Sequence, residues 1–200
     1  LEKQPLLCYD MGMEKLIVAA TGNAHKLKEI RAVLGGWKIL SEAEAGFCGD
    51  VEETGATFAE NALIKAQAVC RATGLPALAD DSGLCVEVLS GAPGVFSARY
   101  SGGGSAENRA LLLKNLKCEK NRNAYFACAV ALVFPDGRIV TAEGKTHGEI
   151  LTREQGENGF GYDSLFFSSD LKKSFAESSE EEKNAVSHRG RALRALETKL

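Results

Sequence analysis

The first strand, turn and helix of the chain constrain its fold most. Lys15–Ala20 is short, apolar and partly β-branched, which is typical of a buried strand. Thr21-Gly22-Asn23 then turns the chain, and Asn23 is a suitable N-cap for a helix that begins at Ala24 and stops at Gly35-Gly36. A strand, a glycine turn and a helix N-terminus in this order form an arrangement that binds phosphate, because the free backbone N–H groups attract anions.

Lys26 lies one turn into this helix. Its ammonium group is a mobile point charge that phosphate oxygens can share, which favours a phosphate site. The alternative is a lysine that is merely solvated, as most lysines in a first helical turn are.

The clearest helix follows Thr57, which is its expected N-cap, with Glu60 in the capping-box position and alanine-rich sequence up to Gly74. The residues expected to face the core are Phe58, Leu63, Ile64 and Ala68. Just ahead of the cap, Glu52-Glu53 either complements the helix dipole or supplies a carboxylate to a metal ion.

Asp80-Asp81-Ser82-Gly83 follows the apolar run Leu75–Ala79, so we expect the two carboxylates at the end of a strand, where side chains can converge on a ligand. No cation is adjacent in the sequence. Two like charges this close either raise one pKa or gather a divalent metal, and Mg²⁺ takes hard oxygen ligands. The alternative is a solvated Asx turn, since Asp-Ser-Gly is common in turns.

Tyr125–Phe134 and Ile139–Ala142 predict a β-hairpin across Pro135-Asp136-Gly137. Gly159–Asp163 is a tight glycine loop with two aromatic rings, which either stack on a purine or pack into the core.

The charge run Glu177–Lys183 would ordinarily be a solvated helix face. Ser187 is a plausible N-cap for a final helix, which places His188 and Arg189 in its first turn. An arginine there opposes the helix dipole, which hints at another role.

Composition limits the classes of protein. The chain has 200 residues, and 44% of them are hydrophobic, which is enough for one core. Its net charge of −3 offers no electrostatic footprint for nucleic acid. The six cysteines are scattered singly, so zinc and disulfide frameworks are not expected. Without a signal-peptide pattern or a run of 18 apolar residues, the protein is expected to be soluble and cytoplasmic, with no membrane partner. Residues 1–12 are expected to be a disordered or added extension, and residues 13–200 a single domain.

Four ordered motifs make the chain resemble the inosine triphosphate pyrophosphatase family, from Leu16 to about Leu196. They are Thr21–Lys26, Glu52–Ala62, Ala79–Leu84 with its continuation to Gly102, and Gly159–Asp163 together with Ser187-His188-Arg189. Each motif is weak alone, but the ordered set is specific.

This resemblance implies an α/β fold, an elongated mixed β-sheet flanked by helices, with two lobes around a central cleft, usually as a homodimer. It implies hydrolysis of inosine, deoxyinosine and xanthosine triphosphates (ITP, dITP, XTP) to the monophosphate and pyrophosphate, with Mg²⁺ as cofactor. Asp81 would be the general base, and the metal site would comprise Asp81 with Glu52 or Glu53 and Asp80. The substrate contacts would be Thr21, Gly22, Asn23, Ala24, His25, Lys26, Ser82, Phe160, Gly161, Tyr162, Asp163, Lys183, His188 and Arg189.

The sequence departs from the family pattern in one loop. Ser164 stands where the family commonly has proline, and Arg153–Gly156 lacks the proline often found there. Two other functions stay open: a Maf-type pyrophosphatase acting on other nucleotides, and a nucleotide-binding protein without catalysis. The Gly-Phe-Gly-Tyr-Asp and Ser-His-Arg motifs disfavour the first, and the crowded carboxylates disfavour the second.

Overall fold

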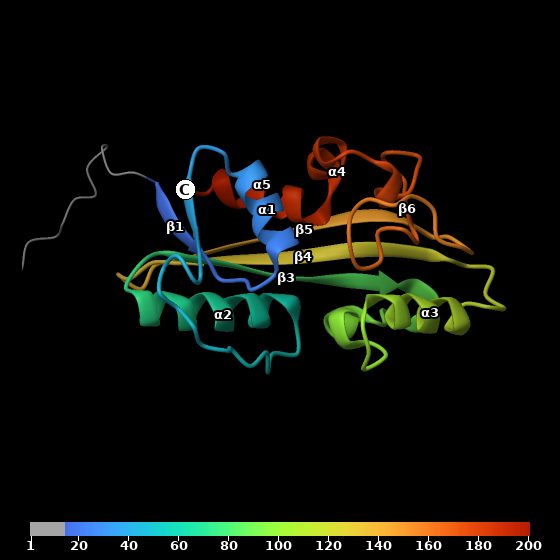
Figure 1. The fold of residues 1–200 in the computed structure, drawn as a ribbon, viewed down its shortest axis with the longest axis horizontal. Helices are drawn as coiled ribbons and strands as arrows, with labels where there is room; N and C mark the ends of the chain where they lie inside the picture. Colours follow the sequence, from blue (N-terminus) through green and yellow to red (C-terminus); the bar gives the residue numbers. More distant parts are fainter. Residues whose placement is uncertain (1–14) are drawn as a thin grey trace, which may run out of the picture.

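The computed structural model describes residues 15–200, which form a mixed six-stranded sheet with helices on both faces (Figure 1). The strand order is β2-β1-β3-β4-β5-β6. β1 pairs in parallel with β2 and β3, and the pairs from β3 to β6 are antiparallel. The strands are β1 Leu16–Ala19, β2 Lys38–Ser41, β3 Ala77–Val86, β4 Asn123–Val133, β5 Ile139–Ile150 and β6 Phe166–Ser168. The predicted mixed-sheet α/β fold is confirmed, and the predicted extension 1–12 lies outside the described residues.

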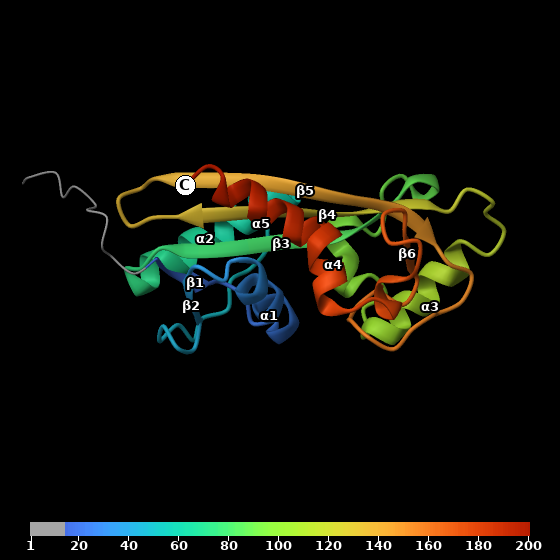
Figure 2. The same ribbon diagram turned by 90° about the horizontal axis from the view of Figure 1, so that it is seen from above.

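The long strands β3, β4 and β5 give the molecule its elongated shape (Figures 1 and 2). β3 pairs with β4 along its whole length, from Ala77 opposite Val133 to Val86 opposite Ala124. β4 and β5 form the predicted hairpin, but β5 continues to Ile150, well beyond the expected end at Ala142. These strands therefore connect both ends of the fold.

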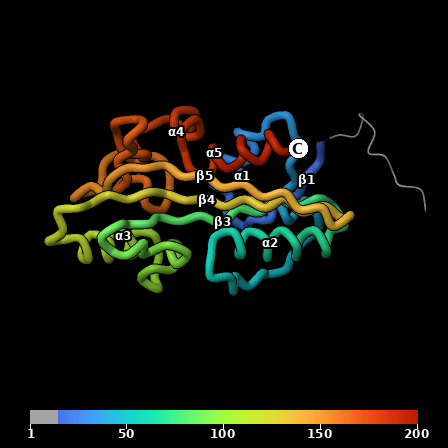
Figure 3. The backbone as a smooth tube through the Cα atoms, turned by 180° about the vertical axis from the view of Figure 1, so that it is seen from behind, coloured from blue at the N-terminus to red at the C-terminus, as the bar shows by residue number. Residues whose placement is uncertain are grey.

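Helices α2 and α3 lie on one face of the sheet, and α1, α4 and α5 lie on the other (Figures 1 and 3). No helix within residues 15–200 is long and apolar enough to cross a membrane. The α-helices are α1 Ala24–Val33, α2 Phe58–Thr73, α3 Ser105–Asn115, α4 Glu180–Val186 and α5 His188–Glu197, and the short 3₁₀ helices are η1 Glu87–Leu89, η2 Gly94–Arg99 and η3 Phe175–Glu177.

The core consists of apolar clusters on the two faces and at the far end of the sheet. One contains Ile30 of α1 and Leu193 of α5, and a second contains Ala66 of α2. A third surrounds Phe126 and Phe166 at the far end of the long strands. A cavity lined by residues from both ends of the fold lies between these clusters.

The start and end of α2 follow the sequence prediction, but its buried face follows it only in part, since Leu63 packs against the core without being fully buried. Thr57 and Glu60 form the predicted capping box, and Gly74 ends the helix in the left-handed region, with φ 68°. The buried face consists of Asn61, Ala62, Ala66, Val69 and Cys70, whereas the predicted Phe58, Leu63, Ile64 and Ala68 are only partly buried. Small alanines allow this helix to approach the sheet closely, so its larger side chains lie at the edges of the contact.

Candidate active site

Asp80 and Asp81 lie inside β3 and are buried, so the expected position at the end of a strand and the alternative of a solvated Asx turn were both wrong. Asp80 lies opposite Val130 of β4, and Asp81 lies opposite Ala129. Pairing with a long neighbouring strand overrides the local turn preference of Asp-Ser-Gly. Because successive residues of a strand point to opposite faces of the sheet, the two carboxylates lie in different surroundings.

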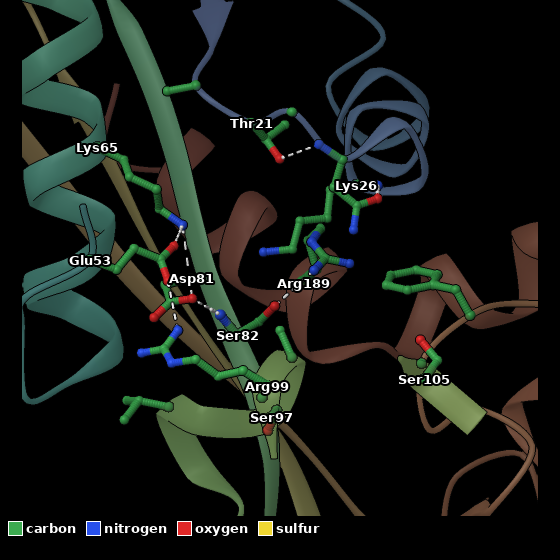
Figure 4. Close-up of a pocket in the computed structure, with 18 of the residues that line it drawn as sticks. Thr21, Lys26, Glu53, Lys65, Asp81, Ser82, Ser97, Arg99, Ser105 and Arg189 are labelled. Carbon is green, nitrogen blue, oxygen red and sulfur yellow. Dashed lines mark hydrogen bonds and ion pairs between the residues drawn. The ribbon is translucent and has the colours of Figure 1, made fainter. Parts of the chain in front are cut away.

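The Asp81 carboxylate is held on both oxygens. Its Oδ2 accepts a hydrogen bond from Nδ2 of Asn61 at 3.1 Å, and its Oδ1 accepts one from the Ser82 N–H at 3.0 Å. Lys65 Nζ lies 3.8 Å from Oδ1 and 2.7 Å from Oε1 of Glu53, between the two acidic side chains (Figure 4). Burial raises the pKa of Asp81, while Lys65 and the Asn61 hydrogen bond oppose this rise.

The predicted metal carboxylates do not form one cluster. Within residues 15–200, no three His, Cys, Asp or Glu side chains are arranged to hold a metal ion. Glu53 and Asp81 converge on the ammonium group of Lys65, and Glu52 lines the same cavity. Asp80 is engaged by other groups, so its expected place beside Asp81 as a metal ligand has no support in the geometry.

Asp80 is instead the centre of a buried ion-pair network. It is 0% exposed, and its Oδ2 accepts hydrogen bonds from Nε and Nη2 of Arg189 at 3.1 and 3.0 Å and from the Ser82 hydroxyl at 3.2 Å. Lys26 Nζ lies 3.1 Å from the same oxygen. Burial alone would raise the pKa of Asp80, but Arg189 and then Lys26 outweigh it and hold this pKa well below its usual range. Asp80 is therefore ionised in the folded protein.

Arg189 is 1% exposed and acidic partners surround its guanidinium group. Besides the two bonds to Asp80, it is paired with Glu29 through Nη1 and donates to the Ser82 hydroxyl at 2.8 Å. Burial would raise the pKa of Glu29, but Arg189 and Lys183 hold it below its ordinary value. The expected role of Arg189 in reading a purine edge stays a prediction, because most of its donors already have protein partners.

His188 precedes Arg189 in the first turn of α5, after the predicted Ser187 cap. Its ring stacks on Phe126 with centroids 4.7 Å apart, and its Nδ1 has no hydrogen-bond partner among residues 15–200. Burial, followed by the charges of Arg189 and Lys183, holds the pKa of His188 well below its usual value. The imidazole is therefore neutral, with an unpaired ring nitrogen.

The glycine loop is fixed to α4 through Lys183. Lys183 Nζ lies 2.7 Å from Oδ2 of Asp163, which also accepts the Phe160 N–H at 2.9 Å. The same ammonium group lies 4.6 Å from the centroid of the Phe160 ring and 2.9 Å from Oε1 of Glu29. The charge run was expected to be solvated, but Lys183 is buried because these carboxylates satisfy its charge.

The two aromatic rings of this loop have different surroundings. Phe160 stacks on the exposed His25 ring, with centroids 5.1 Å apart and planes 16° apart. Tyr162 is buried, and its hydroxyl donates to the Ser97 carbonyl at 2.8 Å. Phe160 is thus a partly buried ring that lines the cavity and contacts His25 and Lys183, and Tyr162 anchors the loop to η2.

The predicted phosphate-binding turn is preorganised. The Asn23 side chain accepts the N–H groups of His25 and Lys26 at 2.9 and 3.3 Å, which confirms the predicted N-cap. The Thr21 hydroxyl accepts the Asn23 N–H at 3.2 Å (Figure 4). The turn and Lys26 face the same cavity as Asp81.

A cavity of about 920 Å³ brings most predicted site residues together. Ala24 and His25 line a smaller neighbouring pocket, and Asp80 is in neither lining. The predicted residues in the large cavity are Thr21, Gly22, Asn23, Lys26, Glu52, Glu53, Asp81, Ser82, Phe160, Gly161, Tyr162, Asp163, Lys183, His188 and Arg189.

The site also contains Asn61, Lys65 and Glu29, which were not predicted from the sequence. Asn61 and Lys65 are four positions apart on α2, so they share the face that packs on β3. Polar residues four positions apart on the buried face of α2 could have indicated a site. The sequence placed the core face of this helix at other residues, so the pair was not recognised.

The sheet and the charged cavity define a mixed α/β protein with a polar cleft. Residues 17–199 match the model of the Ham1 family. A dITP/XTP pyrophosphatase from Streptomyces avermitilis is 50% identical over 188 residues, with 90% of this chain and 94% of that protein covered. A dITP/XTP pyrophosphatase from Haemophilus influenzae is 48% identical, with 94% and 100% covered. The structure of a HAM1 protein from Coxiella burnetii superimposes with a TM-score of 0.84 at 42% identity, over 94% of this chain and 98% of that one.

The chain therefore belongs to the Ham1 family. This confirms the resemblance identified from the four ordered motifs, and it disfavours the Maf-type alternative.

Proposed function

We propose that this protein hydrolyses the non-canonical purine nucleoside triphosphates ITP, dITP and XTP to the nucleoside monophosphate and pyrophosphate. The observation that carries the proposal is the position of Asp81 in a cavity shared with the phosphate-binding turn, in a chain about half identical to proteins named dITP/XTP pyrophosphatases. A carboxylate beside a polyanion site is unfavourable for simple binding and useful for hydrolysis.

The triphosphate would bind at the N-terminus of α1. The positive end of the α1 dipole and the ammonium group of Lys26 would attract the phosphates. The N–H groups of His25 and Lys26 already donate to the Asn23 side chain. Lys26 lies 3.1 Å from Asp80 in the free protein, so phosphate binding would transfer it from one anion to another. Because Asp80 keeps Arg189 as a partner, this transfer leaves no unpaired buried charge.

The base would stack on Phe160, with His188 and Arg189 facing its edge. Backbone N–H groups and the arginine are donors, which suits a carbonyl at C6 and disfavours the amino group of adenine. The neutral His188 ring adds a nitrogen without a protein partner. Most donors of Arg189 are already paired with protein groups, so the preference for a 6-oxo purine would depend on the donors that the base can still reach.

Asp81 would act as the general base. It takes a proton from water as the water oxygen bonds to phosphorus and the bridging P–O bond breaks, which releases pyrophosphate. The raised pKa of Asp81, caused by its burial, makes the carboxylate a stronger base than an exposed aspartate. Lys65 would neutralise charge on the phosphates.

Glu53 and Asp81 would hold the Mg²⁺ ion. The test of fit is that both carboxylates already face one cation, the ammonium group of Lys65, and Mg²⁺ is usually held by one or two carboxylates plus phosphate oxygens. When bound, Mg²⁺ supplies charge neutralisation at the phosphates and lowers the pKa of a bound water. Between the two predicted glutamates, Glu53 is favoured because it shares Lys65 with Asp81.

A pyrophosphate-release assay tests the function. ITP, dITP and XTP should release pyrophosphate in the presence of Mg²⁺, and ATP should release little. Equal rates with ATP would contradict the base assignment, and release of orthophosphate alone would contradict the bond assignment. Without any release, the protein would be the non-catalytic binder.

We also expect a cytoplasmic homodimer that does not bind nucleic acid. The weak negative net charge of −3 supports the last expectation. Light scattering on the purified protein would measure the mass, and a monomer at micromolar concentration would contradict the dimer.

A further inference from the structure

The Asn61 side chain is a buried amide in contact with Asp81. It is 0% exposed and is not among the described residues that line the large cavity. Its Nδ2 donates to Asp81 Oδ2 at 3.1 Å. Asn61 therefore reaches the reaction only through Asp81.

The backbone at Gly55 fixes the orientation of this amide. The Gly55 N–H donates to Oδ1 of Asn61 at 2.8 Å, so this end of the amide must be the oxygen. The other end is then the NH₂ group, which faces Asp81. The donor that Asp81 meets is thus determined by a backbone N–H and not by a free rotation of the amide.

Gly55 can approach this closely because it has no side chain. A Cβ at position 55 would lie 2.7 Å from Asn61 Oδ1 and 2.6 Å from Glu60 Cβ. Glu60 and Asn61 belong to the start of α2, where the Asn61 N–H donates to the Thr57 carbonyl, so the helix backbone places both neighbours of Gly55. The amide is consequently held by a rigid helix terminus.

We propose that Asn61 is the positioning residue of Asp81. The terminal torsion of an aspartate is broad, so the contacts to its two oxygens decide how the carboxylate faces the cavity, and Asn61 supplies the only side-chain hydrogen bond to it among residues 15–200. Asn61 holds Oδ2, and Oδ1 is thereby turned toward the Ser82 N–H and Lys65. This inference rests on the proposed function for its catalytic part, because it assumes that Asp81 is the base.

Asn61→Asp is the decisive variant. It has the same shape and keeps an acceptor for the Gly55 N–H, but it replaces the donor that faces Asp81 by an acceptor. Asn61→Ala removes the contact altogether. In both variants kcat for ITP should fall roughly 10- to 100-fold, because a misplaced catalytic group and a lost bond to a charged group each cost this much. KM should change by no more than about threefold, since Asn61 does not touch the substrate.

Thr57→Ala is the matched control at the same helix terminus. It removes the side-chain cap of α2 and should lower the melting temperature by a few degrees, but the Thr57 hydroxyl contacts neither Asp81 nor the Asn61 amide. Its kcat should equal that of the wild type. If Thr57→Ala lowers kcat as much as the Asn61 variants do, the effect is loosening of the helix and the inference is wrong.

A double variant asks whether Asn61 acts through Asp81. In the Asp81→Asn background, Asn61→Ala should reduce the residual rate no further, because the group that Asn61 positions is no longer a base. Losses that multiply would overturn the inference.

NMR of the side-chain amide groups detects the hydrogen bond between Asn61 and Asp81 independently of catalytic activity. The NH₂ signals that disappear in Asn61→Ala should shift in Asp81→Asn and stay in place in Thr57→Ala. If the Asn61 NH₂ signals have the same chemical shifts in Asp81→Asn as in the wild type, the inference is wrong, even if the wild type is active. If the wild type releases no pyrophosphate, the proposed function fails, and these signals still decide whether Asn61 holds Asp81.

Discussion

Replacing Arg189 by alanine should destabilise the protein strongly. Its guanidinium group bridges Asp80, which is 0% exposed, and the mostly buried Glu29. Alanine would leave both carboxylates in the interior without this partner. Removing one member of a buried ion pair costs about 3–5 kcal/mol, because the remaining charge is desolvated and uncompensated.

The expected loss of unfolding free energy lies near the lower limit of this range, about 3 kcal/mol. Lys26 still lies 3.1 Å from Asp80, and Lys183 still lies 2.9 Å from Glu29, so neither carboxylate is wholly without a cation. A loss of about 3 kcal/mol corresponds to a melting temperature about 6–12 °C lower for a domain of this size. Differential scanning fluorimetry at neutral pH would measure it.

The difference in melting temperature between the wild type and Arg189→Ala should also depend on pH. In the wild type, the pKa values of Asp80 and Glu29 are held below their ordinary values, so these ion pairs stabilise the fold above the unfolded-state pKa. That contribution is lost as pH falls through the lower folded-state pKa. Without Arg189, the largest cause that lowers both pKa values is lost, so the variant can protonate these groups at a higher pH than the wild type. The gap in melting temperature should therefore narrow as the pH falls below about 4, the ordinary range of these carboxyl groups.

Arg191→Ala is the control on the same helix. Arg191 pairs with Asp170, and both side chains are 39% exposed, so its loss should cost less than about 1 kcal/mol. Equal melting temperatures for the two variants, or a gap that does not change with pH, would refute the argument that the buried network stabilises the fold.

Three further outcomes are expected. Asp81→Asn should reduce kcat by roughly two to four orders of magnitude while the melting temperature stays level or rises, and near-normal turnover would remove Asp81 as the base. Lys26→Ala should mainly raise KM for ITP, whereas Lys28→Ala, whose exposed ammonium pairs with Glu180, should change neither constant. An unchanged KM in the first variant would remove Lys26 from the phosphate site. A chelator should stop pyrophosphate release and added Mg²⁺ should restore it, and activity that persists after metal removal would contradict the cofactor assignment.

Local sequence signals predicted the starts of the helices well. Asn23, Thr57 and Ser187 each cap the helix that the sequence assigned to them. A cap depends on hydrogen bonds within a few residues, so the sequence contains nearly all of its physics. The hairpin of β4 and β5 was predictable for the same reason, because its turn is local.

Non-local pairing explains the errors. Asp-Ser-Gly favours a turn locally, but Asp81 and Ser82 are held in β3 by pairing with β4, whose partner residues lie more than forty positions away. The inward face of α2 was predicted only in part, because the close approach of α2 to the sheet selects small residues for its buried positions. Neither effect can be read from a short window of sequence.

The sequence by itself determined the family, the motifs and the set of charged residues from which the cavity is built. Only the tertiary structure decided which charges meet. It joined Asp80 to Arg189 and Lys26, and Asp81 to Asn61 and Lys65, although Asp80 and Asp81 are adjacent in the chain. The physical reason is the alternation of a β-strand, which sends neighbouring side chains to opposite faces, where different helices supply their partners.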